Sequence, residues 1–161
     1  MGVITYEHEI TSSIPQKKVF KAFVLDADNL LPKILPQAVK SVQILEGNGG
    51  VGTLKLITYG EASKYKSATH RVDEIDEANC IYKFSVVKGD VLGDVLDSIS
   101  YVIKIEAAPD GGSVCKTIST YHTKEKDQHI IEEKIKEGKE RTKAMFKAIE
   151  AHLHANHASY N

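Results

Sequence analysis

The 161-residue chain has no tryptophan, only two cysteines and a formal net charge of −1. Cys80 and Cys115 cannot build the disulfide framework of a small secreted domain, and two free thiols suit a reducing compartment. A net charge near zero gives no general reason to expect binding to nucleic acid or to an anionic membrane. No apolar run approaches the roughly 20 residues that span a bilayer, and the N-terminus lacks the apolar core of a signal peptide. We therefore expect a monomer in the cytoplasm, and also in the nucleus, with no membrane or nucleic-acid partner.

What the chain does contain is typical of one globular domain over residues 1–161. Hydrophobic residues make up 42% and charged residues 27% of the sequence, which are ordinary values for a soluble domain. The length is sufficient to bury a sizeable core. No internal repeat, low-complexity run or linker divides it.

Most of the chain has the alternating pattern of β-strands. The N-terminal segment "VITYEHEI" alternates, with Tyr6 and His8 on the same face. Further strands are predicted near residues 39–46, 53–60, 65–75, 80–88, 97–107 and 113–123. The short, turn-like connections between them require antiparallel neighbours. The predicted sheet therefore has about seven strands.

Helical patterns occur at the two ends of this strand region. A short helix is predicted after residue 12, with Ser12 or Ser13 as its N-cap and Pro15 in its first turn. A second short helix follows Asp26 or Asp28. From residue 130 to about 154, apolar residues recur on one helical face. A single helix about 10 Å wide cannot fill the concave face of so wide a sheet, so the sequence predicts a cavity.

The segment "GNGGVG", residues 47–52, fits the G-x-G-x-x-G pattern of dinucleotide-binding loops. The following "TLKLITY" has the period of a strand, whereas that motif requires a helix. Thr53 also stands where a Walker loop requires lysine. The glycines Gly47, Gly49, Gly50 and Gly52 then have two remaining interpretations. They permit tight turns with positive φ, or their N–H groups form a nest for an anion.

Several segments together resemble the plant pathogenesis-related class 10 proteins, the family of the major birch pollen allergen. These are "KAFVLDADNL" (21–30), "PKILPQAVKSV" (32–42), "LEGNGGVGT" (45–53), "HRVDEID" (70–76), "PDGGS" (109–113), "YHTK" (121–124) and the closing "SYN". The resemblance implies an α+β helix-grip fold, in which a curved seven-stranded antiparallel sheet surrounds a long C-terminal helix. Two short helices form a V beneath the helix end. A large internal cavity lies between these elements.

The resemblance also implies a function. Members of this family are plant defence-related proteins that hold small amphiphilic ligands in the cavity, as carriers or stores. Flavonoids, cytokinins, brassinosteroid-like molecules and other plant hormones are the expected ligand classes, and no cofactor is implied. The expected ligand contacts are Tyr6, His8, Phe23, Asp28, Lys55, His70, Tyr82, Phe84, Tyr101, Gly138, Thr142 and Met145.

Several of these residues have a second interpretation. Tyr82 and Phe84 also fit ordinary core positions on an alternating strand. His8 and His70 are either satisfied core residues or hydrogen-bonding groups for a ligand. Gly138, in mid-helix, either makes room for ligand or allows a bend. For a lysine facing a cavity, such as Lys55, the natural partner is Asp28.

Three other functions follow from the resemblance. A ribonuclease would use Asp97 and Glu150, with His152 in place of the family's tyrosine. A hormone receptor or phosphatase inhibitor would need a proline-bearing gate loop, which "YGEASK" (59–64) does not supply. An alkaloid-condensing enzyme would need a catalytic lysine that cannot be placed in this chain.

No dedicated metal site is expected. His152, His154 and His157 are spaced by two and three residues, whereas one helical face requires three or four. Some relatives hold an adventitious cation on backbone carbonyls at Pro32, Leu35 and Ala38.

The entrance to the cavity is predicted between "YGEASK", "KGDVLGD" (88–94) and the start of the long helix.

Overall fold

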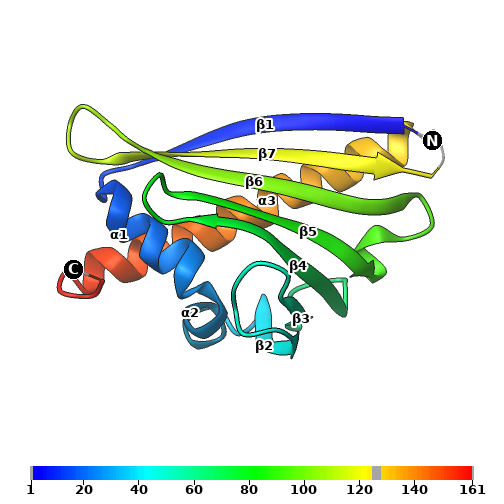
Figure 1. Cartoon of the computed structure of the whole chain (residues 1–161), viewed down its shortest axis with the longest axis horizontal. Helices are drawn as coiled ribbons and strands as arrows, with labels where there is room; N and C mark the ends of the chain where they lie inside the picture. Colours follow the sequence, from blue (N-terminus) through cyan, green and yellow to red (C-terminus); the bar gives the residue numbers. More distant parts are fainter. Residues whose placement is uncertain (1, 125–127, 161) are drawn as a thin grey trace.

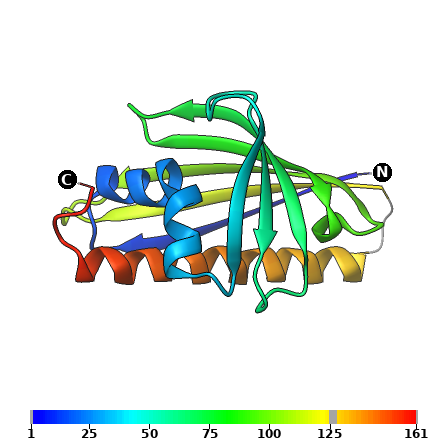
Figure 2. The same ribbon diagram turned by 90° about the horizontal axis from the view of Figure 1, so that it is seen from below.

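Seven strands form one antiparallel sheet that wraps around a long helix (Figures 1 and 2). The computed structural model describes residues 2–124 and 128–160. The strands are β1 (Gly2–Ser12), β2 (Val39–Glu46), β3 (Leu54–Tyr59), β4 (Ser67–Asp76), β5 (Ile81–Gly89), β6 (Leu96–Ala107) and β7 (Ser113–Thr123). Their order across the sheet is β1-β7-β6-β5-β4-β3-β2, so only β1 and β7 are neighbours that are distant in sequence. The predicted helix-grip architecture is confirmed.

The sheet curves because its ladders contain bulges, which bend a strand and increase its twist. Register shifts interrupt the pairing of β2 with β3, of β4 with β5 and of β6 with β7. Between β1 and β7 the register has no shift, from Gly2↔Thr123 to Ser12↔Ser113. The β1–β7 ladder is therefore long and regular, whereas the ladders with bulges bend the rest of the sheet. This bending gives the sheet a concave face.

The helices are α1 (Gln16–Phe20), α2 (Ala27–Ile34) and α3 (Gln128–Ala155), with a π-helical turn η1 (Lys21–Leu25) and a 3₁₀ turn η2 (Asp90–Leu92). The predicted serine cap of the first helix is wrong. Pro15 is the N-cap residue and provides no side-chain hydrogen bond. Instead, the hydroxyl of Ser12 accepts a hydrogen bond from the backbone N–H of Ile14.

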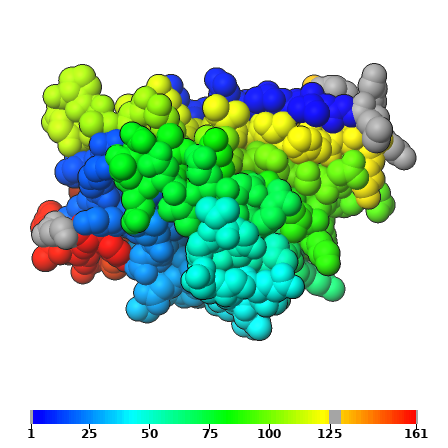
Figure 3. Space-filling model, in the orientation of Figure 1, coloured from blue at the N-terminus to red at the C-terminus, as the bar shows by residue number. Residues whose placement is uncertain are grey.

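The long helix α3 lies in the concave face of the sheet. Strands cover most of its length in the view of Figure 3, in which its C-terminal end remains visible. One core cluster joins α1, η1 and the C-terminal half of α3, where Phe23 packs edge-on against Phe146 with ring centroids 5.3 Å apart. No helix of the described residues is both long and apolar enough to cross a membrane.

Candidate functional site

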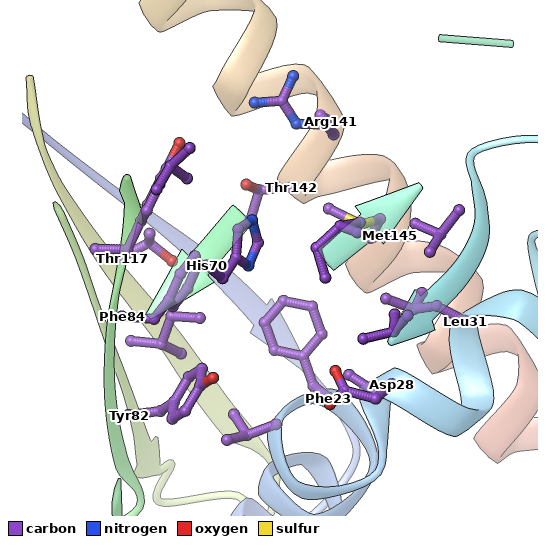
Figure 4. Close-up of a pocket in the computed structure, with 18 of the residues that line it drawn as sticks. Phe23, Asp28, Leu31, His70, Tyr82, Phe84, Thr117, Arg141, Thr142 and Met145 are labelled. Atoms are coloured by element: carbon purple, nitrogen blue, oxygen red, sulfur yellow. The ribbon is translucent and has the colours of Figure 1, made fainter. Parts of the chain in front are cut away.

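A cavity of about 140 Å³ lies between the concave face of the sheet, α2 and the middle of α3 (Figure 4). Its lining is mainly apolar and aromatic. Eight of the twelve predicted contact residues line it: Phe23, Asp28, His70, Tyr82, Phe84, Tyr101, Thr142 and Met145. Thr117 of β7, which was not predicted, also lines it. The cavity is smaller than the large one expected from the sequence.

Stacked rings on the sheet side account for this smaller volume. The ring of Phe84 stacks on His70 and on Tyr101, with centroids 4.8 Å apart in both pairs. Tyr82 stacks on Phe84 at 5.4 Å. The alternation of β5 places Tyr82 and Phe84 on its inner face, and the β5–β6 register sets Phe84 opposite Tyr101. The rings therefore fill space and form one aromatic wall.

His70 is the titratable group within this wall. Burial, with Lys55 and Arg141 nearby, lowers the pKa of His70 to about 3. The imidazole is therefore neutral at physiological pH, with one nitrogen that donates and one that accepts a hydrogen bond.

Lys55 and Asp28 form an ion pair at the cavity end near α2. Their Nζ and Oδ2 atoms are 2.6 Å apart, and the lysine side chain is only 12% exposed. The predicted pairing is confirmed. Asp28 lines the cavity, whereas Lys55, a predicted contact, is not among the lining residues. The ion pair neutralises the charge of Asp28. Burial, with Asp28 and Asp73 nearby, raises the pKa of Tyr82 and keeps its hydroxyl protonated.

Arg141 is a lining residue that the sequence analysis missed. It lies on α3 next to Thr142, at the opposite end of the cavity from Asp28 and Tyr82 (Figure 4). An arginine on a mainly polar helix favours a solvated position, and only its spacing of three residues from Gly138 pointed inward.

Tyr6, His8 and Gly138 lie outside the cavity lining, in contrast to the predicted contacts. Tyr6 faces α3, where the Nζ atom of Lys139 is 5.9 Å from its ring centroid. Both ring nitrogens of His8 are buried without a hydrogen-bond partner in the described structure, so it is not a satisfied core residue. A Cβ atom on Gly138 would lie 2.9 Å from the hydroxyl of Tyr121. That hydroxyl, and not a ligand, occupies the space beside the glycine.

A second hollow, of about 420 Å³, adjoins the cavity and opens between α3 and the β3–β4 loop. It shares Val39, Tyr59, Arg141 and Met145 with the cavity lining. We call it the entrance hollow. The predicted entrance included residues 59–64, and the entrance hollow lies beside this loop. The hollow, however, faces the middle of α3, whereas the prediction placed the entrance at the start of the helix.

Among the described residues, contacts join η2 to the second turn of α3 and to the β3–β4 loop. Lys134 donates from Nζ to the carbonyl oxygen of Val91 in η2 at 2.8 Å. Asp90 accepts hydrogen bonds from the backbone N–H groups of Lys66 and Ser67. These contacts join η2 to both the loop and the helix.

The geometry of the glycine-rich loop favours the conformational interpretation. Gly47, Gly49 and Gly52 have positive φ angles of 94°, 100° and 90°. The N–H of Gly49 donates to Thr53 Oγ1, that of Gly50 to Asn48 Oδ1, and that of Gly52 to the Val72 carbonyl. Three of the donors expected to face an anion therefore have partners within the protein.

The residues of the ribonuclease hypothesis are far apart. Asp97 is near the start of β6, beside the end of β7 that leads towards the start of α3 (Figure 1). Glu150 and His152 belong to the other end of α3, roughly 33 Å along the helix from its first residue. Glu150 pairs with Lys147 at 3.4 Å. The structure does not bring the three side chains together.

Two of the three carbonyls considered for a cation, and two of the three histidines near the C-terminus, have other partners. The carbonyl of Leu35 accepts hydrogen bonds from the N–H groups of Ala38 and Val39, and that of Ala38 accepts from Gly60. His154 contacts the Ser13 hydroxyl, and His152 contacts Asn156. Among the described residues, no three His, Cys, Asp or Glu side chains are placed to hold a metal ion.

An apolar cavity under the long helix of a helix-grip fold defines the structural class of this domain, and the comparisons identify the family. Residues 1–156 match the Pathogenesis-related protein Bet v 1 family. The chain is 56% identical to Major allergen Pru ar 1 of Prunus armeniaca over 161 residues, which is the whole of both chains. It is 54% identical to Major strawberry allergen Fra a 1.05 of Fragaria ananassa, over 99% of each.

Solved structures agree with this assignment. The crystal structure of Ara h 8.0201 superposes with a TM-score of 0.82 at 39% identity, covering 96% of this chain and all of the other. Norcoclaurine synthase from Thalictrum flavum superposes with a TM-score of 0.79, covering 96% of this chain and 88% of the other. At 20% identity it shares the fold alone. The protein belongs to the Bet v 1 family.

Proposed function

We propose that this protein holds small amphiphilic plant molecules in the cavity, as a cytoplasmic, monomeric carrier or store. Flavonoids, cytokinins, brassinosteroid-like molecules and other plant hormones are the ligand classes we would test. The aromatic wall of His70, Phe84 and Tyr101 is the observation that carries the proposal. Such a wall favours flat ring systems, and the few polar groups around it suit ligands with a small number of hydroxyls.

The two volumes limit how a ligand can lie. A dry cavity of about 150 Å³ holds one benzene-sized ring, and the inner cavity here is about 140 Å³. A larger ligand must therefore extend past Tyr59 and Met145 into the entrance hollow of about 420 Å³. We expect one ring against the aromatic wall and the remainder towards the β3–β4 loop.

The test is displacement of a neutral, environment-sensitive dye such as Nile red by a panel of these compounds. Tyr82→Ala should remove contact area worth roughly 1–3 kcal/mol, which weakens ligand binding about tenfold or more. Tyr6→Ala is the matched control, because Tyr6 is a tyrosine on the same sheet outside the cavity lining. If no compound displaces the dye, or if both variants weaken binding equally, the proposal is wrong.

No second function is proposed. The ribonuclease alternative would need Asp97, Glu150 and His152 to act on one substrate, and the length of α3 separates them.

A further inference from the structure

Arg141 carries a positive charge into the wall of the cavity. It belongs to the middle of α3 and lines both the inner cavity and the entrance hollow. Among the described lining residues of the inner cavity it is the only lysine or arginine, and Asp28 is the only carboxylate. The two lie at opposite ends (Figure 4), and Asp28 is paired with Lys55.

The charge of Arg141 has no counter-charge within the described part of the protein. Its guanidinium lies beside the phenol groups of Tyr101, Tyr59 and Tyr121. Burial raises the pKa of Tyr59 and of Tyr121, although Arg141 opposes both shifts, so these phenols stay neutral. A partly buried cation surrounded by neutral hydroxyls is costly unless an anion joins it.

The nearby carboxylates do not supply that anion. Glu137 accepts hydrogen bonds from Lys64 at 2.7 Å and from the hydroxyl of Tyr65. Glu140 lines the entrance hollow but is exposed, and no ion pair joins it to Arg141. The neutral imidazole of His70 adds no negative charge either.

We propose that the ligand of this cavity carries a carboxylate, which Arg141 binds at the junction of the inner cavity and the entrance hollow. The proposal rests on the proposed function and narrows it to one chemical class. The guanidinium donates to the carboxylate oxygens, and the hydroxyls of Tyr59 and Tyr101 lie close enough to the same cation to add donors. The apolar body of the ligand lies against Phe84 in the inner cavity.

A matched pair of small probes tests the charge directly. 2-Naphthoate and 2-naphthalenemethanol have the same ring system and nearly the same size, but only the first is an anion at neutral pH. Calorimetric titration of the wild-type protein should show that the carboxylate binds roughly tenfold or more tightly than the alcohol, as charge-assisted hydrogen bonds require. This comparison needs no variant.

The variants then assign the preference to one residue. Arg141→Met should bring the two affinities together, because the carboxylate loses far more binding than the alcohol, whereas Arg141→Lys should keep most of the preference. Lys143→Met, which removes an exposed charge from the same helix, should have no effect. The melting temperature of unliganded Arg141→Met should hold or rise, because an uncompensated charge has been removed.

Each outcome is decisive. Equal binding of both probes by the wild type overturns the carboxylate proposal and leaves ligand binding intact. A preference that survives in Arg141→Met shows that another group recognises the carboxylate, and it overturns the proposal. A large fall in the melting temperature of Arg141→Met shows that Arg141 is structural, and it overturns the proposal as well. If neither probe nor any compound of the dye-displacement panel binds, the proposed function and this inference both fall.

Discussion

Protonation of His70 should make the stability of the folded protein depend on pH. In the folded protein, burial together with Lys55 and Arg141 lowers the pKa of this histidine to about 3, against 6.5 in an exposed chain. Below pH 6.5 the unfolded chain therefore binds a proton that the folded protein excludes. The stabilising contribution of neutral His70 is fully present above about pH 7. It is lost progressively as the pH falls from 6.5 towards 3.

The two pKa values set the size of the effect. Between about pH 7.5 and about pH 5, protonation in the unfolded state alone should lower the free energy of unfolding by about 2 kcal/mol. The folded state takes up almost no proton in this interval, because its pKa is about 3. An effect of this size is a considerable part of the roughly 5–15 kcal/mol that stabilises a typical domain.

Urea unfolding at a series of pH values, followed by circular dichroism, measures this slope. His70→Phe keeps a ring for stacking on Phe84 and removes the titrating group. Between about pH 7.5 and about pH 5, the free energy of unfolding of the variant should fall by about 2 kcal/mol less than that of the wild type. His157→Phe, at an exposed position, should behave like the wild type. Parallel curves for the wild type and His70→Phe would refute the reasoning, because all other titrating groups are common to both proteins.

Two further substitutions test contacts of α3. Glu137→Gln should weaken the hold of Lys64 on the helix, and amide hydrogen exchange in residues 60–65 should become several-fold faster while that in the strands stays the same. Gly138→Ala should destabilise the protein by about 1 kcal/mol, because the new Cβ would lie 2.9 Å from the Tyr121 hydroxyl, and this overpacking outweighs the gain in helix propensity. In a Tyr121→Phe background the same substitution should instead stabilise the protein, as measured by urea unfolding. A stabilising effect in the wild-type background would show that the hydroxyl moves at little cost.

The strands were predictable because each has a simple local pattern. Alternation along β5 placed Tyr82 and Phe84 on the inner face, and the structure agrees. The inward position of Tyr101 was implied by the resemblance. Turn residues between the strands set antiparallel pairing. The observed bounds differ from the predicted ones by at most two residues, as expected when strand ends are read from composition. No local pattern predicts the pairing of β1 with β7, because these two strands lie at opposite ends of the sheet region in the sequence.

Features that depend on competing local contacts were not predictable. Ser12, Ser13 and Pro15 all lie where the first helix begins, and the choice of Pro15 as N-cap depends on where the preceding strand ends. The π-helical turn η1 is closed by the N–H of Asp26 donating to the carbonyl of Lys21 at 2.8 Å, which no sequence period announces. The cavity volume depends on how the rings stack, which is a matter of side-chain rotamers.

Arg141 shows why the site was harder to predict than the fold. On a mainly polar helix, one arginine among many charged residues reads as part of the solvated face. Its environment becomes visible only when three strands bring Tyr59, Tyr101 and Tyr121 around one position of α3. Each of those tyrosines is an ordinary strand residue by its own local pattern. The chemistry of this cavity therefore arises from residues that are far apart in sequence, and the curvature of the sheet determines which of them meet.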